Sequence, residues 1–389
     1  MRGTDVTSFR RVYRLATASE LPDKLTLTFE KEAELRYGEN PNQPAALYRV
    51  EGQSLAELTN IQLVKGGKGG MSATNVMDVT RALEILKYFP NPSVAVMKHL
   101  IPCGFATARY GEPTYDQTEC YRKARDADTR SAFGSVVVFN DEANVSTANE
   151  ILTTFVEAVA APSYAQGVMD ILEQKKDLRV FTYANLDKIP KFEGDDTKGL
   201  YDFKMLPTGR VVIQKPYLSS IKSIHDLILD PLIKKDGADY VVSRDPLVPE
   251  MQDMLTAWYV NLGVRSNGIV MVRNGVTLAV GSGQQERVGA VEQAIVKAHQ
   301  KEMDRRKMKY DALEGIVDSK ERFLKPLQGA VVSSDAFFPF RDSIDLLGRE
   351  GVTAIIQPGG SINDHEVIQA VNEHGMAMAF TLERCFAHF

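Results

Sequence analysis

A lysine and a histidine stand next to each other after a run of apolar residues. Lys98 and His99 follow Val94-Ala95-Val96-Met97 and precede Leu100-Ile101-Pro102-Cys103-Gly104. Acyl-transfer and nucleobase-modifying sites use such a cation beside a base that titrates near neutral pH. Lys-His dipeptides also occur on many protein surfaces, so the pair by itself indicates only a candidate for catalysis.

The elements around this pair must position it. The apolar run 94–97 is typical of a strand buried on both faces, and Pro102 with Gly104 predicts a turn after it. The other expected elements of this half are an edge strand over 25–29, a helix over 72–86 that Ser72 and Asn75 begin, a strand over 134–139 and a helix over 147–161 that carries Glu157. Strands that alternate with helices indicate a layered α/β fold.

The second half continues this alternation after a stretch without regular period. Residues 166–210 read as irregular, and the charged stretch 193–198 marks the expected domain boundary. Asn274-Gly275 between two β-rich runs is a strong hairpin signal. The expected elements are helices over 250–264 and 288–309, a hairpin within 265–287 that turns at Asn274-Gly275, and strands over 330–332, 352–357 and 376–381 with helices between them. Strands joined through helices predict parallel pairing.

Four further segments carry residue types that bind ligands. Arg36 and Tyr37 lie in a loop with two prolines, and Lys65–Gly70 could cradle a phosphate or form a plain turn, since no Gly-Lys-Ser/Thr closes it. Arg287 follows a glycine-rich turn, which presents N–H groups to an anion. The acid-bordered phenylalanines around Pro339 suit a flat heteroaromatic ligand or plain core.

Composition excludes several classes of protein. The chain has 389 residues, 44% hydrophobic and 25% charged, with a net charge of -5, so nothing global indicates binding to nucleic acid or to an anionic membrane. No apolar run approaches the ~18 residues of a membrane span, and a secretory signal is not expected. Cys103, Cys120 and Cys385 form no spaced framework, which indicates a reducing compartment, the cytoplasm, and argues against a structural zinc cluster.

Five stretches in order resemble one family, the AICAR transformylase domain of bifunctional purine-biosynthesis enzymes. They are Leu35-Arg36-Tyr37-Gly38-Glu39-Asn40-Pro41, Lys98-His99-x-x-Pro102-Cys103-Gly104, Ser131-Ala132-Phe133-Gly134, Ser266-Asn267 with Gly281-x-Gly283-Gln284-x-x-Arg287, and Ser334–Phe340 with Pro358-Gly359-Gly360-Ser361. The resemblance covers residues 31–389. Because little sequence precedes the first stretch, we expect a stand-alone chain that lacks the IMP cyclohydrolase domain, so that another protein closes the ring.

The resemblance implies a fold and an assembly. It predicts two cytidine-deaminase-like α/β/α subdomains in tandem, over 35–205 and 206–389, with an N-terminal lead over 1–34 and a helical insert near 288–325. It also predicts a homodimer with the site at the interface.

The resemblance further implies formyl transfer from 10-formyltetrahydrofolate to the 5-amine of 5-aminoimidazole-4-carboxamide ribotide (AICAR). His99 would take the amine proton, and Lys98 would stabilise the oxyanion and the leaving folate nitrogen. Ribotide contacts are expected at Arg36, Tyr37, His99, Gly134, Glu157, Asn267, Arg287, Phe337 and Arg384. Folate contacts are expected at Val288, Asp342, Ser361 and Ile362. No zinc is expected, and a monovalent cation such as potassium is left open.

Two departures and two alternatives remain. Asn42 stands where the family commonly has histidine, and Ile101 replaces a residue that is often polar. A zinc-dependent deaminase would explain His99 and Cys103, but it needs a glutamate at position 101 and a second cysteine at position 106, where this chain has isoleucine and alanine. A ribotide-binding sensor without catalysis is the other alternative.

Overall fold

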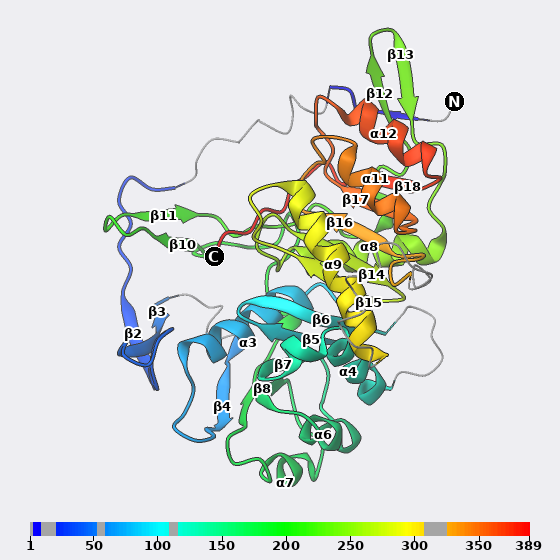
Figure 1. Ribbon diagram of the computed structural model, residues 1–389. Coiled ribbons are helices and arrows are strands. Elements are labelled where there is room, and N and C mark those ends of the chain that lie inside the picture. Colours follow the sequence, from blue (N-terminus) through cyan, green and yellow to red (C-terminus); the bar gives the residue numbers. More distant parts are fainter. Residues whose placement is uncertain (1–2, 9–20, 53–58, 109–115, 307–324) are drawn as a thin grey trace.

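A mixed eleven-stranded sheet runs through the middle of the protein (Figure 1). The computed structural model describes residues 3–8, 21–52, 59–108, 116–306 and 325–389. The strand order is β18-β17-β16-β14-β15-β6-β5-β7-β8-β9-β4. These strands are β4 Gln62–Lys65, β5 Ser93–Lys98, β6 Ile101–Thr107, β7 Ser135–Phe139, β8 Val156–Ala161, β9 Arg179–Thr182, β14 Ile269–Arg273, β15 Val276–Gly281, β16 Val331–Ser334, β17 Ala354–Gln357 and β18 Ala377–Phe380.

The same succession of elements occurs twice along this sheet. Each repeat has a long helix, a hairpin of two strands, a second helix and three parallel strands joined by helices. The helices are α3 Ala73–Leu86, α4 Gln117–Asp126, α5 Thr129–Ala132, α6 Val145–Leu152 and α7 Val168–Leu172 in the first repeat, and α8 Val248–Asn261, α9 Arg287–Arg305, α11 Asp342–Arg349 and α12 Asp364–Glu373 in the second. The parallel pairing expected for the last strands is confirmed.

The two repeats meet where β6 and β15 run antiparallel. Val276 pairs with Ala106, and Thr277 Oγ1 accepts a hydrogen bond of 2.8 Å from the N–H of Phe105. This antiparallel junction reverses the second repeat relative to the first. The two repeats therefore present opposite ends of their parallel strands to any one edge of the sheet.

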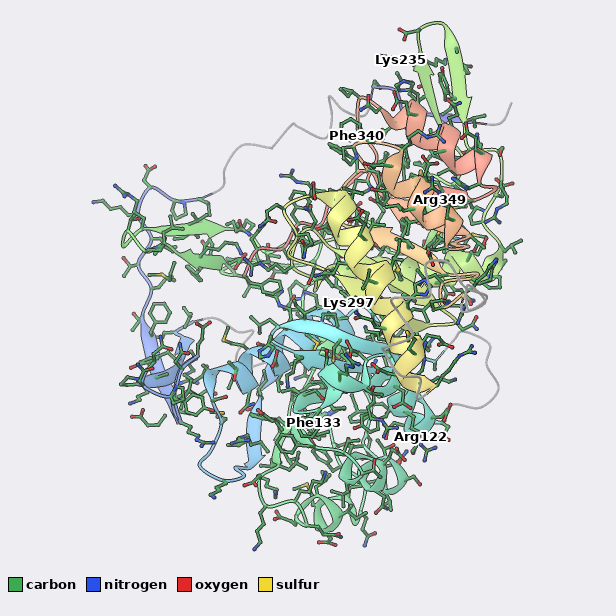
Figure 2. All side chains as sticks on the ribbon, viewed as in Figure 1. Arg122, Phe133, Lys235, Lys297, Phe340 and Arg349 are labelled. Atoms are coloured by element: carbon green, nitrogen blue, oxygen red, sulfur yellow. The ribbon has the colours of Figure 1, made fainter. Side chains whose placement is uncertain are left out.

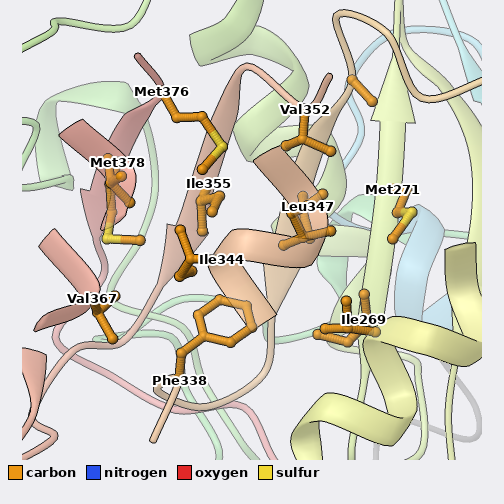
Figure 3. Close-up of a cluster of buried hydrophobic side chains, with 14 of the residues drawn as sticks. Ile269, Met271, Phe338, Ile344, Leu347, Val352, Ile355, Val367, Met376 and Met378 are labelled. Atoms are coloured by element: carbon orange, nitrogen blue, oxygen red, sulfur yellow. The ribbon is translucent and has the colours of Figure 1, made fainter. Parts of the chain in front are cut away.

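Helices cover both faces of the sheet and give three layers. α3 and α8 pack on one face, where their apolar residues share a buried cluster with alternate residues of β5 and β14. α4, α6 and α7 cover the other face of the first repeat, and α9, α11 and α12 that of the second. Figure 3 shows part of the latter core, where Phe338, Ile344 and Leu347 pack against Ile355. The α/β class is confirmed.

Two glycines let the central strands approach their helices. A Cβ at Gly104 on β6 would lie 1.8 Å from the carbonyl oxygen of Ala124 on α4, and one at Gly281 on β15 would lie 2.2 Å from that of Ala290 on α9. The expected turn at Pro102–Gly104 is therefore wrong. These residues belong to β6, and the turn lies at His99-Leu100.

Other sequence expectations are corrected by the structure. The helix expected over 147–161 is two elements, α6 and the buried strand β8, because residues 156–161 pair with β7 and β9. The stretch expected to be irregular contains α7 and β9. The strand expected over 25–29 begins at Phe29 instead and continues as β2. The helix expected over 288–309 is α9, which begins at Arg287 and ends at Arg305, and residues 307–309 lie outside the described residues.

Three smaller sheets lie beside the main one (Figure 1). They contain β1 Thr4–Asp5, β2 Phe29–Leu35, β3 Ala45–Val50, β10 Asp202–Met205, β11 Val211–Gln214, β12 Pro231–Lys235 and β13 Ala238–Val241, and two short 3-10 helices are η1 Leu186–Lys188 and η2 Ile224–Asp226. β1 pairs with β12, which joins the chain start to the second half. Among the described residues, no helix is long and apolar enough to cross a membrane.

Candidate active site

One edge of the main sheet collects the residues that the sequence singled out. At this edge β5 ends with Lys98, and β7 and β8 begin near Gly134 and Glu157. In the second repeat β14 begins after Asn267 at the same edge, where the other strands end. The segments that follow those ends carry Arg287, Val288, Phe337, Asp342, Ser361, Ile362 and Arg384.

Lys98 and His99 lie at a tight hairpin turn. Lys98 pairs with Ile101, and both residues between them have a positive φ, 54° at His99 and 67° at Leu100. The N–H of Leu100 donates a 2.6 Å hydrogen bond to Oδ1 of Asp78 on α3. The His99 side chain is exposed, so it is accessible to a substrate at this edge.

Two backbone carbonyls hold the ammonium group of Lys98. Its Nζ donates to the oxygens of Phe133 at 2.8 Å and Gly134 at 2.9 Å. Gly134 has φ 72°, and a Cβ there would lie 3.0 Å from Lys98 Nζ. The glycine therefore permits the lysine to lie against the start of β7. The ring of Phe133, labelled in Figure 2, is 64% exposed and 5.2 Å from that of Phe155.

A second layer of polar groups lies behind this turn. Glu157 is on β8, and its Oε2 accepts a 3.2 Å hydrogen bond from Nδ2 of Asn75. Burial raises the pKa of Asp78, and the negative charge of Glu157 raises it further, whereas the Leu100 N–H, His99 and Lys98 lower it. Sequence reasoning missed Asp78, which lies among the charged groups of this turn.

Arg36 and Tyr37 are held against the start of α3. The Arg36 N–H donates to the Met71 oxygen at 2.8 Å, and the guanidinium lies 5.2 Å from the Tyr37 ring centroid. The Lys65–Gly70 turn lies next to this loop. A Cβ at Gly69 would be only 3.3 Å from Arg36 Nε. Lys65 is buried and donates to the Leu178 oxygen at 2.8 Å, so it is not available as a phosphate ligand.

Arg287 and Asp335 form a buried ion pair in the second repeat. Arg287 Nη1 donates to Asp335 Oδ1, and the two side chains are 5% and 0% exposed. Ser266 Oγ donates to the other oxygen of Asp335 at 2.6 Å. Asn267 Nδ2 donates to the Gln284 oxygen at 2.8 Å, which fastens the glycine-rich turn to the start of β14. The pair fixes the guanidinium at this edge.

The C-terminal segment and the aromatic loop lie next to that pair. The Cys385 N–H donates to the backbone carbonyl oxygen of Asp335 at 3.0 Å, so the neighbouring residue Arg384 is held close to the ion pair. Arg384 itself is exposed. Phe338 is fully buried, whereas Phe337 is half-buried and Phe340 is 56% exposed. Only part of the expected aromatic platform is therefore core.

The residues expected to contact folate come from adjoining loops. Asp342 begins α11 with its side chain exposed, and Ser361 and Ile362 follow β17. Asn363 Nδ2 donates to the Pro339 oxygen at 2.9 Å, which joins these two loops. Val288 follows Arg287 in the first turn of α9.

Cys103 has the environment of a structural thiol. Its Sγ donates to the Val96 oxygen at 3.3 Å, and burial raises its pKa to about 12. A thiol with such a pKa is protonated at neutral pH and is a poor metal ligand. Among the residues that the structure describes, no group of three or more His, Cys, Asp or Glu side chains is arranged to hold a metal ion.

A buried contact between the repeats also supports the lysine clamp. Lys301 Nζ on α9 lies 3.2 Å from Asp128 Oδ2, and Asp128 accepts the Ser131 N–H at 3.0 Å as the cap of α5. α5 leads directly into Phe133 and Gly134. The sequence carried no signal for this contact, because Lys301 lies in a run of mixed charges.

Comparison with known proteins identifies the family. Residues 6–297 match the family described as the AICARFT/IMPCHase bienzyme. The chain belongs to the AICARFT/IMPCHase bienzyme family. It is 37% identical over 370 residues to the bifunctional purine biosynthesis protein PurH of Acetivibrio thermocellus, which covers 95% of this chain and 62% of that protein. It is 35% identical over 382 residues to PurH of Aquifex aeolicus, covering 98% of this chain and 64% of the relative.

This AICARFT/IMPCHase family member spans less than two thirds of the length of those relatives. The matched region includes the Lys98-His99 turn and the start of α9 with Arg287.

Proposed function

We propose that this chain transfers a formyl group from 10-formyltetrahydrofolate to the 5-amine of AICAR, giving the formylated ribotide FAICAR and tetrahydrofolate. The observation that carries the proposal is the Lys98-His99 turn, with an exposed imidazole beside a clamped ammonium, in a chain of this family. The reaction joins a weak arylamine nucleophile to an acyl carbon. It therefore requires a base and a group that stabilises negative charge.

Each residue of the pair has one task in this reaction. His99 accepts the proton lost by the 5-amine, directly or through the neighbouring carboxamide, as the nitrogen bonds to the formyl carbon. Lys98 stabilises the oxyanion that forms on the carbonyl oxygen. When the bond between the formyl carbon and the folate nitrogen breaks, Lys98 stabilises the departing nitrogen, which takes up the proton that His99 accepted, and the base is restored.

The remaining sites bind the two substrates. We assign the ribotide to Arg36, Tyr37, His99, Gly134, Glu157, Asn267, Arg287, Phe337 and Arg384, and the folate to Val288, Asp342, Ser361 and Ile362. The exposed guanidinium groups of Arg36 and Arg384 suit a phosphate, and the half-buried Phe337 ring suits a heterocycle.

We propose the tandem cytidine-deaminase-like arrangement with boundaries 1–34, 35–205 and 206–389, and a helical insert near 288–325. The twofold succession of elements supports it. We propose a homodimer with the site at the interface. Two hairpins that project from the body support it, because Phe29 and Tyr48 on β2 and β3 and Met205 on β10 are 55%, 50% and 73% exposed (Figure 1).

We assign the reaction to the cytoplasm, with a monovalent cation such as potassium as an optional bound ion. The deaminase alternative is not favoured, because the cysteine it would use is half-buried, donates to a backbone carbonyl and has a pKa raised to about 12. The sensor alternative predicts binding without turnover.

Incubation of the purified chain with AICAR and 10-formyltetrahydrofolate separates these activities. Mass spectrometry should detect AICAR carrying one added formyl group, with tetrahydrofolate formed in equal amount. Binding of AICAR by calorimetry without this product would favour the sensor. Release of ammonia from a cytosine- or adenine-based nucleoside, lost with a zinc chelator, would favour the deaminase.

A further inference from the structure

Two buried aspartates hold the two hairpin turns of the main sheet. Asp78 and Asp253 occupy the same position in helices α3 and α8, which are each 14 residues long. Asp253 accepts the N–H groups of Asn274 and Gly275, both at 2.8 Å. Asp78 accepts the N–H of Leu100 at 2.6 Å. The repeats therefore share a device in which a helix carboxylate binds a hairpin turn.

The two turns differ in how well their residues suit this conformation. Asn274 and Gly275, with φ of 56° and 72°, are the residue types most favoured in a two-residue turn with positive φ. His99 and Leu100 adopt similar angles, although a Cβ makes this region unfavourable, and a bulky side chain such as leucine is rare there. The first turn therefore depends on a partner outside itself.

Asp78 also lies where its charge affects the candidate chemistry. The groups that interact with it electrostatically come from three neighbouring strands or turns, namely Lys98 on β5, His99 in the turn and Glu157 on β8. Asp78 is only 7% exposed, so water screens its charge little. Asp253 faces a turn that carries no base.

We propose that Asp78 is a positioning residue for His99, which fixes the His99-Leu100 turn through the Leu100 N–H and so holds the imidazole at the edge of the sheet. The catalytic part of this role, the positioning of His99 as a base, rests on the proposed formyl transfer. The hold on the turn itself does not depend on the identity of the reaction.

Amide hydrogen exchange in the substrate-free protein tests the hold directly. Asp78→Ala should speed exchange of the Leu100 amide by about 10-fold or more. Asp78→Asn, which keeps an acceptor oxygen, should have a smaller effect and covers the case in which Asp78→Ala does not fold. Unchanged Leu100 exchange in both variants would overturn the proposal.

Kinetics with AICAR and 10-formyltetrahydrofolate test the consequence for catalysis. Asp78→Ala should lower kcat by about 10- to 100-fold and leave KM for AICAR within about twofold, because misplacement of the base affects the reaction step. Leu100→Gly in the same background should restore much of kcat, since glycine tolerates the positive φ. The control Asp253→Ala should lower the melting temperature and leave kcat unchanged.

The outcomes distinguish this proposal from the proposed function. An inactive wild type would contradict formyl transfer, and the exchange result would then decide the Asp78 proposal alone. If the wild type is active, the Asp78 proposal would be overturned by an equal kcat in Asp78→Ala. It would also be overturned if Leu100→Gly did not restore kcat in the Asp78→Ala background.

Discussion

The hairpin turns of the two repeats have equivalent positions filled by different residues. Lys98 in the first repeat corresponds to Arg273 in the second, and each cation donates to backbone carbonyls, of Phe133 and Gly134 in one case and of Pro326 and Gln328 in the other. His99, however, corresponds to Asn274. The difference teaches that this fold supplies a clamped cation and a held turn in both repeats, while one side chain makes a turn suitable for proton transfer.

The antiparallel junction of β6 and β15 gives the repeats complementary tasks at one edge. The first repeat presents its hairpin turn there, with the proposed base. The second presents the carboxyl ends of β16, β17 and β18, followed by the loops that carry Phe337, Ser361 and Arg384. Ligands commonly bind at the carboxyl ends of parallel strands. In the proposed assignment the first repeat supplies the base and part of the ribotide site, and the second supplies the other substrate contacts.

Replacement of the two clamped cations, Lys98 and Arg273, should give the largest difference in kcat between the repeats. Lys98→Met should lower kcat by about 100- to 1,000-fold, because the developing oxyanion loses its stabilising charge. Arg273→Met should leave kcat within about twofold, since Arg273 donates to the Pro326 and Gln328 carbonyls of its own repeat, away from the Lys98-His99 turn. Equal losses of kcat in steady-state assays of the two variants would contradict the assigned role of Lys98.

The equivalent glycines at the starts of β7 and β16 give a smaller effect. Gly134→Ala places a Cβ 3.0 Å from Lys98 Nζ and should lower kcat by about 10-fold or more. Gly329 has a similar φ, 74°, but a Cβ there would lie 4.0 Å from Arg273 Cδ. Gly329→Ala should cost about 1 to 2 kcal/mol of unfolding free energy for the strained φ and leave kcat unchanged. Chemical denaturation and kinetics on both variants distinguish these results.

The smallest expected effect concerns acid stability. Arg341 and His374 lower the pKa of Asp345 on α11 to about 2, and arginines likewise lower that of Glu150 on the corresponding helix α6. A carboxylate with a lowered folded-state pKa stabilises the protein above its unfolded pKa of about 4, and this contribution disappears as pH falls toward 2. Melting temperatures measured from pH 6 to 2.5 should fall less steeply in Asp345→Asn than in the wild type. Parallel curves would show that the ion pairs of Asp345 with Arg341 and His374 contribute nothing to the pH dependence of stability.

The sequence predicted those parts whose residue types match their conformation. Asn274-Gly275 indicated its hairpin, and Ser72 with Asn75 indicated the start of α3, where the structure has a capping box. The His99-Leu100 turn was not predicted, because neither residue favours a positive φ and the hold by Asp78 comes from a helix distant in sequence. The sequence indicates a turn at Gly104, because the close approach of this strand glycine to Ala124 on α4 leaves no local sequence pattern.

The position of Glu157 shows the same limit. Its apolar neighbours fit one face of a helix as well as a buried strand, and only pairing with β7 and β9 decides between them. The resemblance supplied the set of candidate site residues without their geometry. Asp78 and the Lys301 contact to Asp128 required the fold, because each joins segments that no local pattern connects.

Single-turnover formyl transfer by the wild type, His99→Ala and Asn274→Ala tests the central claim most directly. With saturating AICAR and 10-formyltetrahydrofolate, the account predicts rapid formation of formylated ribotide by the wild type and by Asn274→Ala. It predicts that the rate of His99→Ala is lower by at least about 100-fold, because the proposed base is removed. The Asn274-Gly275 turn, in contrast, has only a structural role in this account. Equal rates for the wild type and His99→Ala would contradict it.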